Sequence, residues 1–216
     1  MAGLLLLCLA YWWLDNLAHE IFGTAMFLIL ARHIYQNRSW FRNLTRGPYG
    51  VRRTVIVAFH VALAVNMIVL LVTSLAISQS LFAKLPLPDS ATLSELHWFS
   101  AYWVIIAVGC HLGLHWPRIR AFINAAFNLP PATVLQTRLL LLLAAILFVI
   151  GFASLSTLDI ATKLSFRLSP NFWDFSTSVT PFFVRWVGVM ALPAIATHCV
   201  VNIAGRRRAS SRNSRA

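Results

Sequence analysis

Four histidines in this chain occur as two pairs with the same spacing. His19 and His33 lie within one apolar segment, His97 and His111 lie within another, and the members of each pair are fourteen residues apart. Fourteen residues are four helical turns less about 40°, so both imidazoles of a pair leave one face of a helix, about 21 Å apart along its axis. Histidine is a common metal ligand, and two opposed pairs of imidazoles could fill the axial positions of two haem irons.

The composition predicts that the helices carrying these histidines cross a membrane. Hydrophobic residues make up 59% of the 216 residues and charged residues only 11%, whereas a soluble domain carries about a quarter charged residues. We therefore predict an all-α fold, a polytopic transmembrane helical bundle of about five spans with a four-helix haem-binding core. The predicted spans cover residues 14–35, 54–78, 96–116, 139–156 and 181–203.

The predicted bundle occupies residues 14–204, and two short segments flank it. Residues 1–13 form an apolar lead-in that is too short to span a membrane, either an interfacial segment or the end of a truncated helix. We expect Asp15 to cap the first span and Pro117 to end the third. Residues 205–216 form a basic, serine-rich tail, which we expect to be disordered.

The positions of the basic residues predict the orientation. The formal net charge is +12, and most arginines follow the first span, the third span or the fifth. Because cytoplasmic loops carry an excess of Lys and Arg, we predict a multi-pass protein of a bacterial inner membrane, with its N-terminus outside and its C-terminus cytoplasmic. The orientation of the spans in the membrane thus explains the positive net charge, so we do not expect nucleic acid as a partner. Spans one and three then run parallel, which places His19 level with His97 near the outer surface and His33 level with His111 near the inner one.

Small and basic residues near the histidines are compatible with haem. Gly23 lies one turn after His19, and Gly109 lies two residues before His111. A position without a side chain leaves room for a porphyrin, although close packing of two membrane helices explains the same glycines. Arg38 and Arg118, or their neighbours Arg42 and Arg120, would pair with haem propionates on the inner side.

A third histidine of the later segment competes for the role of ligand. His115 is eighteen residues from His97, a rise of about 27 Å, which overshoots the roughly 21 Å between His19 and His33. We therefore assign His111 as the ligand and place His115 at the inner haem edge or at a quinone-type site. His60 and His198 lie in other spans, and we expect each to form a hydrogen bond with a neighbour.

The histidine segments resemble a bacterial family of small, cytochrome-b-like di-haem membrane domains. The resemblance covers residues 10–116, and the positions that carry it are His19, Glu20, Gly23, His33, Asn37, Trp40, His97, Tyr102, His111, Gly113, His115 and Trp116. The spacing of the histidines is also similar to that of the di-haem cytochromes of the b type. The resemblance implies two b-type haems and electron transfer, without a named donor or acceptor.

These observations predict a membrane-embedded b-type di-haem cytochrome that transfers electrons across the bilayer. Bis-imidazole ligation leaves no position for substrate on the iron, so a catalytic residue is not expected, although the chain could be the membrane subunit of an oxidoreductase. Besides membrane lipid, its partners would be a quinone or a redox partner subunit. Two alternatives stay open: a histidine-lined transporter of divalent metal ions, and a membrane scaffold without a cofactor.

Overall fold

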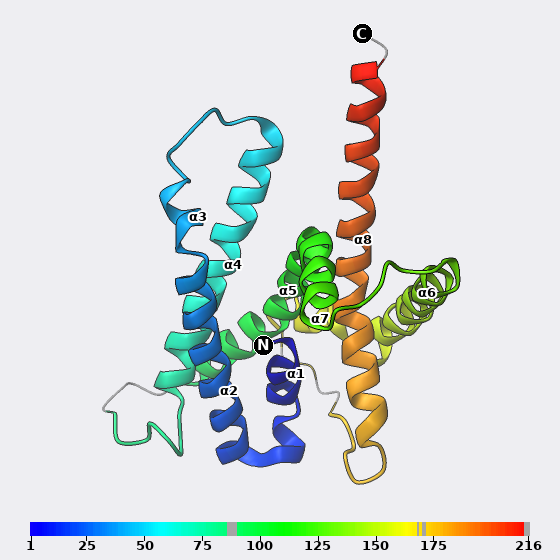
Figure 1. Ribbon diagram of the computed structural model, residues 1–216. Coiled ribbons are helices and arrows are strands. Elements are labelled where there is room, and N and C mark those ends of the chain that lie inside the picture. Colours follow the sequence, from blue (N-terminus) through cyan, green and yellow to red (C-terminus); the bar gives the residue numbers. More distant parts are fainter. Residues whose placement is uncertain (86–89, 168, 170–171, 214–216) are drawn as a thin grey trace. The chain divides into compact units, whose positions relative to one another are not determined.

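The computed structural model describes residues 1–85, 90–167, 169 and 172–213, and within them the regular secondary structure is entirely helical (Figure 1). Five helices are long and apolar enough to cross a membrane. This confirms the predicted all-α fold with about five spans, and it identifies the chain as a multi-pass membrane protein. The helices are α1 (Ala2–Leu9), α2 (Tyr11–Gln36), α3 (Arg38–Arg42), α4 (Val51–Ala76), α5 (Ala91–Ala126), α6 (Val134–Thr157), α7 (Ile160–Lys163) and α8 (Val179–Asn213).

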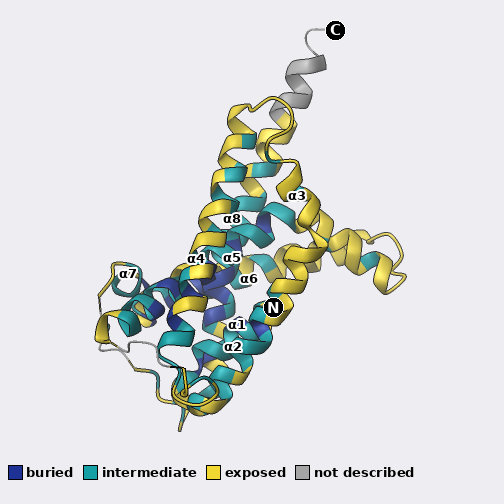
Figure 2. Ribbon diagram, turned by 90° about the vertical axis from the view of Figure 1, so that its left-hand side faces the viewer, coloured by how far each residue is buried: buried dark blue, intermediate teal, exposed yellow. Residues whose placement is uncertain are grey.

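Most apolar side chains of these spans are not covered by protein. Figure 2 shows exposed and half-buried positions over most of the helical surface, with buried positions in short stretches. On α6, for example, Leu141 and Phe152 are exposed while Gly151 and Ser154 are buried. A helix that is apolar all round is suited to hydrocarbon rather than to water, so the exposed faces are those that lipid would cover.

Two helices are longer than the sequence predicts. α5 continues through Pro117 to Ala126, so the predicted end of this span at residue 116 is wrong. Proline in a membrane helix removes one backbone hydrogen bond without ending the helix, because neighbouring groups can satisfy the freed carbonyl. α8 continues through Pro193 to Asn213, so the tail expected to be disordered from residue 205 is helical over most of its length. Arginine and alanine favour helix, and no proline follows residue 205.

The chain forms two compact units, and the first contains the N-terminal helices. It comprises residues 1–104 and 162–177, with α1 to α4 and the first part of α5. Within it, α1 packs against α2. Four residues into α2, Asp15 has a φ of 66° and a ψ of 171°, which kink the helix. Asp15 therefore marks a sharp bend rather than the simple cap predicted, and the lead-in is a short helix folded onto the first span.

The second unit comprises residues 105–161 and 178–216, and glycines bring its helices close together. A Cβ added to Gly109 would lie 2.6 Å from Pro193 Cγ, and one added to Gly113 would lie 2.9 Å from the Ala194 carbonyl carbon. On the other side of α8, Gly151 and Gly188 meet in the same way. Each contact is closer than a real Cβ allows, so α8 packs against α5 and α6 only because these positions are glycine.

Candidate functional site

The structure brings together one histidine from each of the two predicted pairs. His19 lies on α2 and His97 on α5, and their ring centroids are 6.1 Å apart at an interplanar angle of 67°. His97 is buried, with 9% of its surface exposed, and His19 is half-buried. Both belong to the first unit. The structure therefore brings together the two histidines that the sequence pairs, while their role as ligands of one haem stays a prediction.

The ring of His19 is held by the short helix α1. Its Nδ1 lies 2.9 Å from the carbonyl oxygen of Cys8. A carbonyl oxygen can only accept, so Nδ1 carries the hydrogen and donates it, which leaves the lone pair on Nε2. The fold of α1 back onto α2 thus decides which nitrogen of His19 is available to a metal ion.

The ring of His97 is held by two hydroxyl groups of α4. Its Nδ1 lies 3.2 Å from Thr73 Oγ1 and 3.5 Å from Ser74 Oγ. Thr73 donates its own hydrogen to the carbonyl of Val69 or Leu70, and Ser74 donates to that of Leu70 at 2.7 Å. Each hydroxyl oxygen can then only accept from the imidazole, so His97 also carries its hydrogen on Nδ1 and its lone pair on Nε2.

This arrangement fits two imidazoles that ligate one metal ion. Metal-ligating histidines almost always donate the other ring N–H to a protein acceptor, which fixes the tautomer and the ring orientation. Metal–nitrogen bonds are about 2.0 Å long, so two imidazoles on opposite sides of one ion have centroids about 6 Å apart. The 6.1 Å between His19 and His97 agrees with that separation. The donor set, two neutral imidazoles, is the one that low-spin haem iron takes at its axial positions.

The surroundings of the pair combine open space with aromatic rings. A Cβ added to Gly23, one turn after His19, would meet nothing within 4 Å among the described residues. Tyr11 meets the His19 ring edge-on, with centroids 5.3 Å apart. Trp12 in turn contacts Trp98, one residue beyond His97, at 6.2 Å. The free space beside Gly23 is compatible with a planar ligand, as the sequence predicts.

Glu20, the neighbour of His19, ties α2 to the segment that follows α4. Its Oε1 accepts hydrogen bonds from the backbone N–H groups of Gln79 at 2.8 Å and Ser80 at 3.1 Å, and from the Asn16 side chain at 2.9 Å. Its Oε2 accepts from the Ser78 hydroxyl at 2.8 Å and from the Leu81 N–H at 2.6 Å. Five donors thus converge on one carboxylate, which fixes the position of α2 beside the end of α4.

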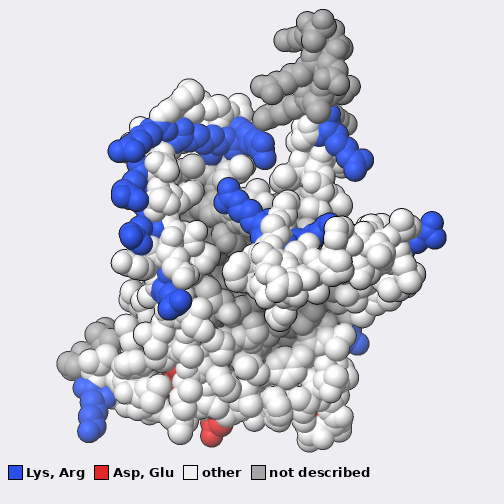
Figure 3. Space-filling model, in the orientation of Figure 1, with Lys and Arg blue, Asp and Glu red and all other residues white. Residues whose placement is uncertain are grey.

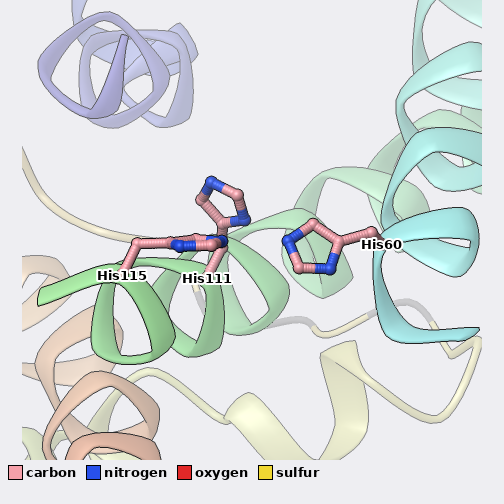
Figure 4. Close-up of side chains that lie close together, drawn as sticks. All are labelled: His60, His111 and His115. Carbon is pink, nitrogen blue, oxygen red and sulfur yellow. The ribbon is translucent and has the colours of Figure 1, made fainter. Parts of the chain in front are cut away.

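The other predicted ligands lie on the expected helices. His33 is exposed on α2, and His111 is half-buried on α5, so each predicted fourteen-residue pair lies on one helix, and on α2 both histidines follow the kink at Asp15. Figure 4 shows His111 and His115 on α5 and His60 on α4. The rings of His111 and His115, one turn apart, have centroids 4.7 Å apart. His33 and His60 belong to the first unit and the α5 pair to the second, so the pairing of His33 with His111 stays a prediction.

The remaining candidate residues have other neighbours. Gly109 faces Met190 and Pro193 of α8, so close helix packing, the alternative reading of this glycine, accounts for it. Arg38 is exposed, donates to the Tyr35 carbonyl at 3.0 Å and stacks over the Tyr35 ring at 4.3 Å. Arg118 is exposed on α5. The association of Arg38 and Arg118 with haem propionates stays a prediction.

Two histidines outside the predicted pairs form hydrogen bonds within their own helices. His60 Nδ1 lies 2.6 Å from the Ile56 carbonyl, and His198 Nε2 lies 2.9 Å from Asn202 Nδ2. Both match the expectation of a hydrogen bond to a neighbour. His60 also contacts the ring of Trp40, at a centroid distance of 5.5 Å.

Sequence reasoning missed the residues that orient the two imidazoles. Thr73 and Ser74 are adjacent hydroxyls near the end of a mainly apolar span, and this could have indicated a buried acceptor. Cys8 acts through its backbone carbonyl, which any residue could supply, so no side-chain signal exists for it.

No protein-family model, curated protein or solved structure matches this chain. The resemblance of residues 10–116 to cytochrome-b-like domains is thus carried only by the motif residues. The chemistry of the site has to be inferred from the side chains and their geometry.

Proposed function

We propose that this protein is a membrane-embedded cytochrome that binds b-type haem and transfers electrons across the bilayer. The observation that carries the proposal is the His19–His97 pair, with centroids 6.1 Å apart and both Nδ1 atoms held by acceptors. Two imidazoles from different helices, both with Nε2 as the available nitrogen, are the donors that a haem iron needs on its two sides. A bare zinc site would need additional protein ligands or water.

The residues around the pair would hold the group rather than react with substrate. His19 and His97 would supply one axial nitrogen each. The Cys8 carbonyl holds the ring of His19 in one tautomer, and the Thr73 hydroxyl does the same for His97. Both hydrogen bonds make Nε2 of the ring a stronger ligand for a metal ion. Glu20 fixes the helix that carries His19. Haem held in this way supplies a one-electron redox centre with no position for substrate.

A second haem would be held by His33 and His111. The proposal rests on their spacing: each lies fourteen residues from a member of the first pair on the same helix. The rise of about 21 Å fits within a hydrocarbon core of roughly 30 Å, so two haems would connect the two membrane surfaces. His115, one turn from His111, would lie at the edge of this haem or at a quinone site.

The predicted location follows from the basic residues. The chain would lie in a bacterial inner membrane, with the N-terminus and the His19–His97 haem near the outer surface and the C-terminus in the cytoplasm. A quinone or a redox partner subunit would exchange electrons at either side. In that case the protein would be the membrane subunit of an oxidoreductase.

The test is the visible spectrum of the purified protein and of three variants. We expect a dithionite-reduced b-type spectrum with about two haems per chain. His19→Leu and His97→Leu should each remove the same haem and leave the other, whereas the control His198→Leu should keep both. Colourless protein from haem-sufficient cells would refute the proposal. Loss of different haems in the two ligand variants would refute the pairing.

A further inference from the structure

The connection between α2 and α4 carries a dense positive charge. Residues 37–53 contain five arginines and no Asp or Glu. Figure 3 shows blue side chains gathered over the region where α3 and the start of α4 lie. Topology alone would require basic residues beside a span, but it would not require them to be arranged on an ordered segment.

One of these arginines organises the segment. The guanidinium of Arg53 donates to the carbonyls of Asn43 at 2.7 Å, Leu44 at 3.2 Å and Pro48 at 3.2 Å. It also packs on the ring of Tyr49, 4.1 Å from the centroid. These contacts join the end of α3 to the start of α4, so the segment has a defined conformation rather than being a free chain.

The other four arginines are exposed on this ordered segment. They are Arg38 and Arg42 on α3, Arg46 in the turn and Arg52 at the start of α4. No carboxylate lies within residues 37–53 to neutralise them. A guanidinium binds phosphate oxygens through two parallel hydrogen bonds, so the chemistry that fits this surface is a phosphate group.

Exposed aromatic side chains on this segment are of the kind found at a membrane interface. Phe41 is 46% exposed and Tyr49 is 48% exposed, although both lie in a polar connection. Trp40 is half-buried and contacts the ring of His60 on α4. Aromatic residues are enriched at the level of lipid headgroups, where their rings meet the apolar layer and their polar atoms meet water. At that level of a membrane, the phosphate available to these arginines would be that of a lipid headgroup.

We propose that the arginines of the α2–α4 connection bind the phosphate of an anionic phospholipid headgroup. A basic residue near an anionic membrane surface is expected to improve binding about fivefold. The surface would therefore select phosphatidylglycerol over the zwitterionic phosphatidylcholine. This inference depends on α2 and α4 crossing a membrane and not on the presence of haem.

The test measures lipid binding by the full-length protein in detergent with native mass spectrometry. The probes are dioleoylphosphatidylglycerol and dioleoylphosphatidylcholine at equal concentration. The double variant R46Q/R52Q should lose the preference for phosphatidylglycerol by up to about 25-fold, two steps of about fivefold. The matched control K84Q/R167Q removes two exposed charges from other segments and should change the preference less than about twofold.

A second measurement does not depend on the variants. The preference of the unmodified protein should decrease as salt rises from about 50 mM to about 500 mM, because ions screen exposed charges. Equal binding of the two lipids, an equal loss in both double variants, or a preference insensitive to salt would overturn the proposal. So would complete displacement of the lipid by an equal concentration of inorganic phosphate, which would identify a free-anion site.

Discussion

Replacing Glu20 with glutamine is expected to release the segment that follows α4. The carboxylate accepts five hydrogen bonds, three of them from consecutive backbone N–H groups of residues 79–81. The amide of glutamine is isosteric but has one oxygen only. If its NH₂ replaces Oε2, the bonds from Ser78 and Leu81 are lost. If it replaces Oε1, those from Asn16, Gln79 and Ser80 are lost.

The size of the effect follows from these losses. A hydrogen bond to a charged acceptor contributes about 1.5–3 kcal/mol, and replacing the charge weakens the bonds that survive. Gln79, Ser80 and Leu81 are exposed, so water replaces part of each lost interaction and the low end of the range applies. We therefore expect the local free energy of opening to fall by about 2 kcal/mol, which corresponds to roughly a 30-fold change in an equilibrium constant.

The assay is amide hydrogen exchange of the protein in detergent, read on peptides that cover residues 77–85. In Glu20→Gln, the amides of residues 79–81 should exchange roughly 30-fold faster, while peptides of α6 should be unchanged. Glu95→Gln is the matched control, because Glu95 is a carboxylate two residues from the proposed ligand His97 and belongs to a different helix. Unchanged exchange in Glu20→Gln, or equal acceleration in both variants, would show that the carboxylate does not hold this segment.

Three further predictions concern the surroundings of the site and the loop before α8. Thr73→Val should weaken haem retention by about 10–100-fold, because His97 loses the nearer acceptor for Nδ1–H and keeps only Ser74 Oγ at 3.5 Å, whereas Thr73→Ser should retain haem. Transfer of haem to a scavenger protein measures the retention, and equal retention in both variants would refute the tautomer assignment. Burial raises the pKa of the Cys8 thiol to about 12. Alkylation of this thiol by iodoacetamide at about pH 8 should therefore be on the order of a thousandfold slower than alkylation of an ordinary thiol. Rapid labelling of Cys8 in the folded protein would contradict this prediction. Hydrogen bonds from the side chain and then the backbone of Ser176 lower the pKa of Asp174 below its ordinary value of 3.8. The turn that contains Asp174 and Ser176 should therefore be fully formed above pH 3.8 and be lost as the pH falls through the lower pKa of the folded protein. Asp174→Asn should abolish this pH dependence, which the amide signal of Ser176 reports.

The sequence by itself was sufficient for the features that local pattern determines. Long apolar segments predicted five membrane helices, because hydrocarbon accepts only segments that satisfy their own backbone hydrogen bonds. The fourteen-residue spacing placed each histidine pair on one helix, since helical periodicity is a local property. The same reasoning paired His19 with His97, which the structure brings together.

Local pattern was insufficient at the ends of helices. Pro117 was expected to end its span and the tail after residue 204 to be disordered, yet α5 continues past Pro117 and residues 205–213 are helical. Propensity is a weak prior that context overrides, and a single proline costs a long helix only one of its backbone hydrogen bonds.

Only the tertiary structure decided how the two imidazoles are oriented. The acceptor for His97 comes from Thr73, twenty-four residues earlier, and the acceptor for His19 is a backbone carbonyl made available when α1 folds back at Asp15. Glu20 accepts hydrogen bonds from backbone N–H groups about sixty residues away in the sequence. Contacts of this kind form between segments far apart in the chain, so local pattern does not specify which groups meet. A backbone donor or acceptor, in addition, leaves no trace in residue type.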